Sequence, residues 1–173
     1  VEENLWFAEP GAPAAQLLER PAFYPGSLAV SGDRALWTDG QQHVLTDGTT
    51  AGTIALAPPV NTQLYDPVAF GGGFAMSGQE YTSQGTVSGL YRVDPTTPEV
   101  TRVRTFEGSW FSGLQGSGGY LYFQAGQRLW RSDLTALGTQ EIGSSYSAEP
   151  SELTRFGPLV LWRNQSGLRW LRD

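Results

Sequence analysis

One short pattern occurs twice in this chain and restricts its fold more than any other feature. Residues 44–56 read VLTDGTTAGTIAL, and residues 129–142 read LWRSDLTALGTQEI. Each contains an apolar strand, a tight turn opened by an aspartate (Asp47 or Asp133), and a second strand entered through Gly-Thr. A hairpin used twice indicates a repeat architecture, in which each unit buries its apolar face against its neighbours.

The composition agrees with strands joined by tight turns. The 173 residues include 22 Gly and 11 Pro, 12% are aromatic, and only 16% are charged. Aromatic residues favour strands and Gly and Pro favour turns, and no segment shows a helical period of apolar residues. We therefore predict an all-β fold with minimal helix.

The turn acids give the length of the repeat. Glu9, Asp47, Asp94, Asp133 and Asp173 are separated by 38, 47, 39 and 40 residues. Four strands in about 40 residues are typical of a β-propeller blade. We predict one propeller domain over residues 1–173, of about four four-stranded blades, with units at roughly 1–20 (partial), 21–58, 59–104, 105–143 and 144–173 (partial).

The repeated hairpins also resemble a known family. VLTDGTTAGTIAL, LWRSDLTALGTQEI, the preceding LYF strand at residues 121–123 and the linker GSSYSAEPSELT at residues 143–154 are similar to the ELWxSDGTxxGTxxV repeat of bacterial exported propeller-like proteins. The resemblance implies a bacterial protein that works outside the cytoplasm, in the periplasm, at the cell surface or secreted. The chain departs from this pattern at residues 93–100 and at Leu134, where the turn Gly is replaced.

Two ways of closing the ring are open. The strands expected at residues 4–8 and 14–18 can pair with those at 152–171 and complete a fourth blade, which removes open sheet edges. Alternatively the chain is half of a larger ring, completed by a second copy as a homodimer or by a longer chain. The chain starts at Val1, and we expect a processed or excised product.

Charge and composition exclude several classes of partner and chemistry. A net charge of −6 with 11 scattered Arg residues disfavours nucleic acid, whose phosphates require clustered cations. The absence of Cys excludes disulfides, thiolate metal sites and cysteine nucleophiles. No apolar run approaches the roughly 20 residues of a membrane span, and we expect no basic-then-apolar leader at the amino end. We expect no cofactor.

The turn aspartates and the single histidine are weak candidates for chemistry. Calcium needs six to eight oxygen ligands, whereas Asp47, Asp94 and Asp133 each stand alone in their turns. We interpret these carboxylates as acceptors for turn amides that fix the hairpins. His43 has no triad motif around it, and we expect a satisfied or surface-exposed side chain.

Aromatic residues in the links between blades are better candidates for a binding surface. The links at residues 20–26, 57–67, 104–111 and 143–150 each contain one at a similar place: Tyr24, Tyr65, Trp110 and Tyr146. If these links cross one face of a propeller, the four rings form a platform for sugar or protein. The alternative is that each ring is wedged between blades as part of the core.

An inserted polar loop at residues 78–88 adds Glu80 and Tyr81 at its tip. We predict a noncatalytic module that binds a protein or glycan, with Tyr24, Tyr65, Trp110, Tyr146 and Tyr81 as ligand-binding residues. Two alternatives remain. One is a structural segment of a larger surface assembly. The other is a glycan-active enzyme that uses the loop carboxylates Asp66, Glu80, Glu107, Glu149 and Glu152.

Overall fold

The computed structural model describes residues 5–7, 16–19, 27–38, 41–107, 111–144, 151–156, 159–164 and 167–172. The described residues form strands and turns without a helix, as predicted. Three antiparallel sheets have four strands each, and their strands follow chain order within the sheet. The first comprises β3 (Ser27–Ser31), β4 (Arg34–Thr38), β5 (His43–Thr46) and β6 (Ile54–Ala55).

The next two complete sheets follow the same plan. One comprises β7 (Thr62–Phe70), β8 (Gly73–Thr82), β9 (Gly85–Val93) and β10 (Val100–Glu107), and the other comprises β11 (Phe111–Ser117), β12 (Tyr120–Ala125), β13 (Arg128–Ser132) and β14 (Gln140–Ser144). The three-stranded sheet β15 (Ser151–Phe156), β16 (Leu159–Asn164) and β17 (Gly167–Arg172) comes last. These are propeller-type blades, which confirms the predicted fold class.

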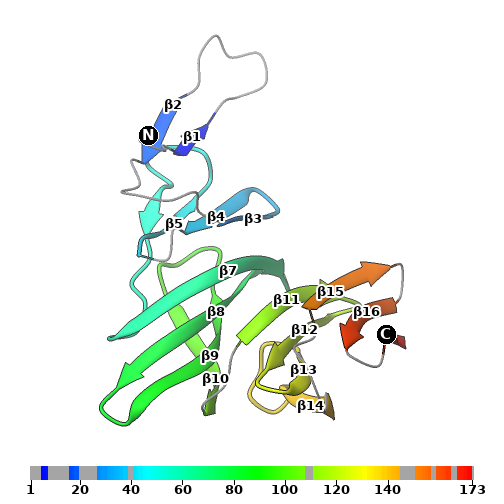
Figure 1. Cartoon of the computed structure of the whole chain (residues 1–173). Coiled ribbons are helices and arrows are strands. Elements are labelled where there is room, and N and C mark those ends of the chain that lie inside the picture. The colour runs from blue at the N-terminus through cyan, green and yellow to red at the C-terminus, as the bar shows by residue number, and fades with distance from the viewer. Residues whose placement is uncertain are drawn as a thin grey trace.

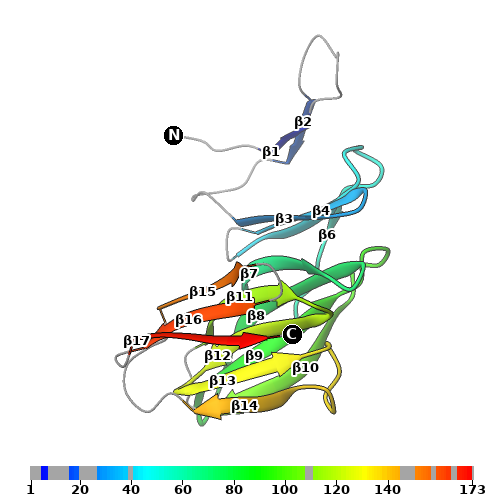
Figure 2. The ribbon, with the colours of Figure 1, turned by 90° about the vertical axis from the view of Figure 1, so that its right-hand side faces the viewer.

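The first strands of successive blades lie against one another. β3 contacts β7, β7 contacts β11, and β11 contacts β15. Figures 1 and 2 show the blades following each other in chain order along an arc. The blades β7–β10 and β11–β14 therefore each meet the preceding blade through one face and the following blade through the other.

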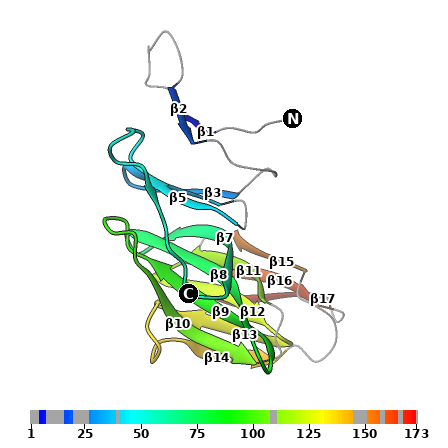
Figure 3. The ribbon, with the colours of Figure 1, turned by 90° about the vertical axis from the view of Figure 1, so that its left-hand side faces the viewer.

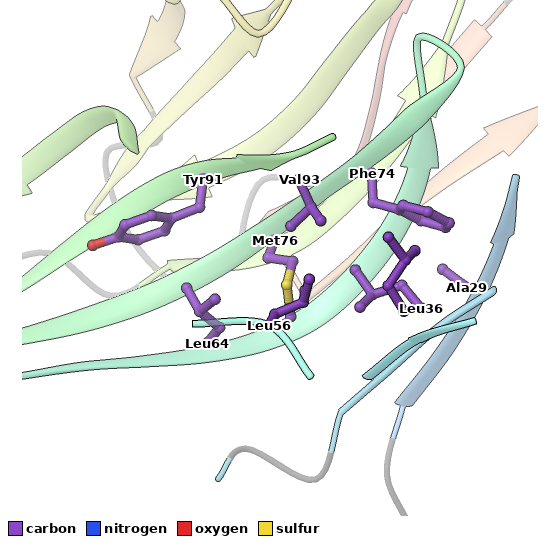
Figure 4. Packing of buried hydrophobic residues seen from close by; sticks show 9 residues of the cluster. Ala29, Leu36, Leu56, Leu64, Phe74, Met76, Tyr91 and Val93 are labelled. Carbon is purple, nitrogen blue, oxygen red and sulfur yellow. The ribbon is translucent and has the colours of Figure 1, made fainter. Parts of the chain in front are cut away.

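The core consists of the layers between these faces. Leu36 and Leu56, from the first complete blade, pack with Phe74, Met76 and Val93 from the second, as Figure 4 shows. The next layer contains Ala75, Leu90 and Phe106 against Leu121, Phe123 and Ala125, and the last joins Tyr122 and Leu129 to Val160. Because side chains alternate across a strand, the blades β7–β10 and β11–β14 each contribute to two layers.

The ring is not closed by the strands expected to close it. β1 (Leu5–Phe7) and β2 (Gln16–Glu19) pair with each other in a separate sheet, and neither joins β15–β17 among the described residues. Figures 1 and 3 place this hairpin beyond β3–β6, at the opposite end of the arc from β15–β17. The predicted pairing of residues 4–18 with 152–171 is wrong for this structure.

The insertion expected as an irregular loop at residues 78–88 is regular β-structure. β8 and β9 continue in register to the pair Thr82–Gly85, which leaves a two-residue turn. The cross-strand pair Gly78 and Gly89 permits this extension, because a Cβ atom at either position would lie 2.6 or 2.8 Å from the buried ring of Tyr91. The polar insertion therefore lengthens β8 and β9 and extends the surface of their sheet.

Candidate functional site

The repeated aspartate turn is a closed network of hydrogen bonds. In the first copy, the backbone N and Oγ1 of Thr49 donate to Asp47 Oδ1 at 2.9 and 2.7 Å. Gly52 N donates to Thr49 Oγ1 at 2.9 Å, and Thr53 Oγ1 donates to the Thr49 carbonyl at 2.6 Å. Each position of the D-x-T-x-x-G-T pattern that both copies share thus has a hydrogen-bonding role.

The second copy repeats this network closely. Thr135 N and Oγ1 donate to Asp133 Oδ1 at 2.8 and 2.7 Å, and Gly138 N donates to Thr135 Oγ1 at 2.9 Å. Below the turn, the hydroxyls of Ser132 and Thr139 pair at 2.7 Å in a buried position. The agreement between the two turns shows that the repeated sequence encodes a turn stabilised by its own side-chain hydrogen bonds.

Electrostatics and steric fit also indicate that the aspartates stabilise the turns. The Thr49 hydroxyl, then its backbone amide, lowers the pKa of Asp47, and Thr96 and Thr135 lower the pKa of Asp94 and Asp133 in the same way. The glycine is required because a Cβ atom at Gly138 would lie 2.0 Å from Asp133 Oδ1. The prediction that these carboxylates fix the turns is confirmed.

A different surface brings two of the predicted binding residues together. Tyr65 lies on β7 and Tyr81 on β8, and both hydroxyls donate to Gln63 Oε1, at 2.5 and 2.8 Å. Gln79 Oε1 lies 3.3 Å from the Tyr81 hydroxyl. We call Gln63, Tyr65, Gln79 and Tyr81 the tyrosine–glutamine cluster.

The strand register builds this cluster. Gln63 is directly opposite Gln79, so each tyrosine, two residues further along its own strand, falls on the same face. Tyr81 is exposed and Tyr65 is half-buried. Partial burial, and then the neighbouring Tyr81, raises the pKa of Tyr65, so the Tyr65 hydroxyl keeps its proton at neutral pH.

The cluster corrects one prediction and adds two residues. Tyr65 lies within a nine-residue strand and not in a link across a propeller face, because β7 begins at Thr62. Tyr24, Trp110 and Tyr146 lie outside the described residues. Gln63 and Gln79 were not predicted, although the spacing Q-x-Y occurs at residues 63–65 and again at 79–81 and places glutamine and tyrosine on one face of a strand.

The loop acids do not assemble into a catalytic pair within the described side chains. Glu80 forms an ion pair with Arg102 at 2.6 Å. Asp66 lies in a bulge of β7, where its Oδ2 is 3.5 Å from Ser77 Oγ. Glu149 and the side chains of Glu107 and Glu152 lie outside the described residues.

A surface depression lies between the turns of neighbouring blades. This open groove of about 410 Å³ is bordered by the hairpin at residues 71–73, by Arg92, and by Asp94 and Asp133. Both carboxylates already accept hydrogen bonds within their own turns. In the described part of the chain, no three His, Cys, Asp or Glu side chains are grouped closely enough to hold a metal ion.

The single histidine has a structural position. His43 is buried at the start of β5, and its Nδ1 lies 2.6 Å from Thr38 Oγ1 on the paired strand. The side chain is thus satisfied, which agrees with one of the two expectations, but it is not exposed. Among the residues that the structure describes, there is no helix long and apolar enough to cross a membrane.

No protein-family model matches the chain, and no curated protein matches it either. Among solved structures, it is similar to the computationally designed Ika4 protein, with a TM-score of 0.51 and 15% identity over 84% of this chain and 88% of that one. It is also similar to a chain of a nidogen/laminin complex, with a TM-score of 0.56 and 14% identity over 92% of this chain and 64% of that one.

A third similar structure is an oligogalacturonate lyase in complex with manganese, with a TM-score of 0.56 and 15% identity over 91% of this chain and 55% of that one. This chain therefore spans less than two thirds of the length of the nidogen/laminin and lyase chains. Likeness at this level of identity supports the propeller-like fold alone.

Proposed function

We propose that this protein is a noncatalytic binding module and that its tyrosine–glutamine cluster binds a neutral oligosaccharide. The observation that carries the proposal is the convergence of the Tyr65 and Tyr81 hydroxyls on Gln63 Oε1. This contact holds two rings and an amide in one arrangement on a regular sheet. A preorganised surface of this kind loses little side-chain entropy when a ligand binds.

The chemistry of the cluster suits a sugar. Tyrosine rings offer an apolar face to the C–H groups of a pyranose, and amide and phenol groups exchange hydrogen bonds with its hydroxyls. The cluster contains no Asp, Glu, Lys, Arg or His, and the whole chain carries a net charge of −6. A neutral oligosaccharide therefore fits better than an acidic one, which this charge would repel.

The biological setting follows from the same proposal. A glycan-binding module of an exported bacterial protein would meet its ligand in the periplasm, at the cell surface or outside the cell. The similarity of the hairpins at residues 44–56 and 129–142 to the exported-protein repeat supports this location. A protein ligand is the alternative, because tyrosine is also enriched at protein interfaces.

The proposal is tested with a panel of immobilised neutral glucan and mannan oligosaccharides, with polygalacturonate as the acidic comparison. Wild-type protein should be retained on at least one neutral glycan. Tyr81→Ala should weaken that binding about tenfold, the effect of losing one stacking ring. Val60→Ala removes an exposed apolar side chain outside the cluster and is the matched control.

Retention on the neutral glycan that Tyr81→Ala leaves unchanged would overturn the proposed site. Absence of binding to every glycan would overturn the proposed ligand class. Because Tyr81 is exposed, the substitution should leave the thermal midpoint unchanged, and that measurement separates lost binding from lost folding.

A further inference from the structure

The hydrogen bonds inside the tyrosine–glutamine cluster determine which polar groups it can offer to a ligand. A tyrosine hydroxyl has one proton to donate, and an amide oxygen has two lone pairs that can accept. The hydroxyls of Tyr65 and Tyr81 both donate to Gln63 Oε1, at 2.5 and 2.8 Å. Both lone pairs of this oxygen are therefore used, and so is the proton of each hydroxyl.

The amide nitrogen of Gln63 keeps both of its N–H groups for a ligand. In the part of the chain that the structure describes, the buried polar side-chain atoms without a partner are the Tyr91 hydroxyl, the Trp130 indole nitrogen and Arg131 Nε. Gln63 Nε2 is not among them, and the hydrogen bonds of the cluster do not use it, so it faces solvent. Gln79 is exposed and contacts Tyr81 through its Oε1, which leaves its amide nitrogen on the surface as well.

These N–H groups are held in place by the bonds on the other side of the amide. Turning the Gln63 amide over would exchange its oxygen for its nitrogen and break the hydrogen bonds from two tyrosines. The two strands are antiparallel and Gln63 is opposite Gln79, so Tyr65 and Tyr81 extend from this pair in opposite directions. The surface thus has N–H donors at its centre and an aromatic ring on each side.

A ligand that fits this surface needs a strong hydrogen-bond acceptor beside a small apolar group. An acetamido group has both, because its carbonyl oxygen accepts from N–H groups and its methyl group packs on an aromatic ring. Its own N–H can donate to a tyrosine oxygen, whose lone pairs remain available. The group is also uncharged, and the one charged residue between Gln79 and Tyr81, Glu80, alternates to the other face of the sheet and pairs there with Arg102.

We propose that the ligand of the tyrosine–glutamine cluster is an N-acetylated oligosaccharide, whose acetamido carbonyl accepts hydrogen bonds from the Gln63 amide. This inference rests on the proposed glycan-binding function and selects one class among the neutral sugars. A sugar with a hydroxyl in place of the acetamido group still stacks on the rings but lacks the carbonyl and the methyl group. The hydrogen bond and the buried methyl together should make the N-acetylated ligand bind about tenfold more tightly.

The test compares two tetrasaccharides that differ only at C2 of each sugar, β-1,4-linked N-acetylglucosamine and β-1,4-linked glucose. Their dissociation constants are measured by calorimetry with the whole chain. Gln63→Glu keeps an oxygen that accepts from both tyrosines and removes the N–H groups, so the tenfold preference should fall to about one. Gln84→Glu adds the same charge at an exposed turn residue of the same hairpin, and this matched control should keep the preference.

Each result has a separate meaning. Equal binding of the two tetrasaccharides by wild type would overturn the acetamido assignment and leave the proposed function standing. A preference that survives Gln63→Glu would also overturn it, because the Gln63 N–H groups would then not recognise the ligand. Failure to bind either sugar or any other neutral glycan would overturn the proposed function itself. If the thermal midpoint shows that Gln63→Glu is unfolded, Gln79→Glu at an exposed position takes its place and should also reduce the preference.

Discussion

Substitution of Gly138 by alanine tests the structural role of the repeated turn. A Cβ atom at this position would lie 2.0 Å from Asp133 Oδ1 and 2.2 Å from Asp133 Cγ, far inside van der Waals contact. The carboxylate must move, and it then loses the hydrogen bonds from Thr135 N and Oγ1. The bond from Gly138 N to Thr135 Oγ1 depends on the same geometry.

The size of the effect follows from these three bonds. Each contributes about 0.5–1.5 kcal/mol net, with the lower end appropriate because the turn is exposed, for a total of about 1.5–2 kcal/mol. Restricting the unfolded chain through Gly→Ala returns about 0.5 kcal/mol. We therefore expect Gly138→Ala to lower the free energy of unfolding by about 1–1.5 kcal/mol.

Gly143→Ala is the matched control. Gly143 lies in the same blade, and a Cβ atom there would have no neighbour within 4 Å. Urea denaturation should show this control at or slightly above wild-type stability. If Gly138→Ala is as stable as Gly143→Ala, the turn does not depend on the fit between the glycine and the carboxylate.

A double-mutant cycle identifies the cause. After Asp133→Ala, no carboxylate opposes the new methyl group, so Gly138→Ala should then cost little. The two substitutions should be strongly non-additive. Additive costs would contradict the reasoning, because they would place the damage of Gly138→Ala somewhere other than at Asp133.

Further predictions concern pH, backbone strain and packing. The pKa values of Asp47, Asp94 and Asp133 are lowered in the folded protein, so these carboxylates contribute their full stabilisation above the unfolded pKa. This stabilisation is lost as the pH falls through the folded pKa values. Urea titrations from about pH 6 to 2.5 should show the loss of stability, and Asp133→Asn should make that loss smaller. Leu134 has a φ of 65° where the first turn has Gly48, so Leu134→Gly should raise the urea midpoint by removing about 1 kcal/mol of strain. A lower midpoint would contradict this and show that the packing of Leu134 against the second core layer outweighs the strain. Gly78→Ala should lower stability by about 1–3 kcal/mol through its contact with the Tyr91 ring, and an unchanged melting temperature would show that the ring can move aside.

The sequence was most informative where the chemistry is local. The D-x-T-x-x-G-T turns use side chains within seven residues of one another, so their spacing alone indicates the hydrogen-bond network. Glycines, which adopt positive φ easily, also indicated the hairpin corner at Gly71 and Gly72, where the structure has φ values of 61° and 78°. Features of this kind depend little on the rest of the fold.

Features that depend on tertiary contact were missed. The start of β7 was assigned to the link at residues 57–67, whereas the structure has a strand from Thr62 with a bulge in which Asp66 has a φ of 50°. The polar, glycine-rich segment after Met76 was assigned to a loop, because the fit of two glycines around the Tyr91 ring cannot be seen in the sequence. The same two errors hid the tyrosine–glutamine cluster, which requires both extended strands.

The most direct test of the account is an NMR titration of protein with ring-labelled tyrosine. The chain has seven tyrosines, and substitution to phenylalanine assigns their signals one by one. On addition of the neutral oligosaccharide retained on the glycan panel, the signals of Tyr65 and Tyr81 should shift together and saturably, while those of the buried Tyr91 and Tyr122 stay in place. Shifts confined to other tyrosines, or no shift at saturating oligosaccharide, would contradict the assignment of binding to this surface.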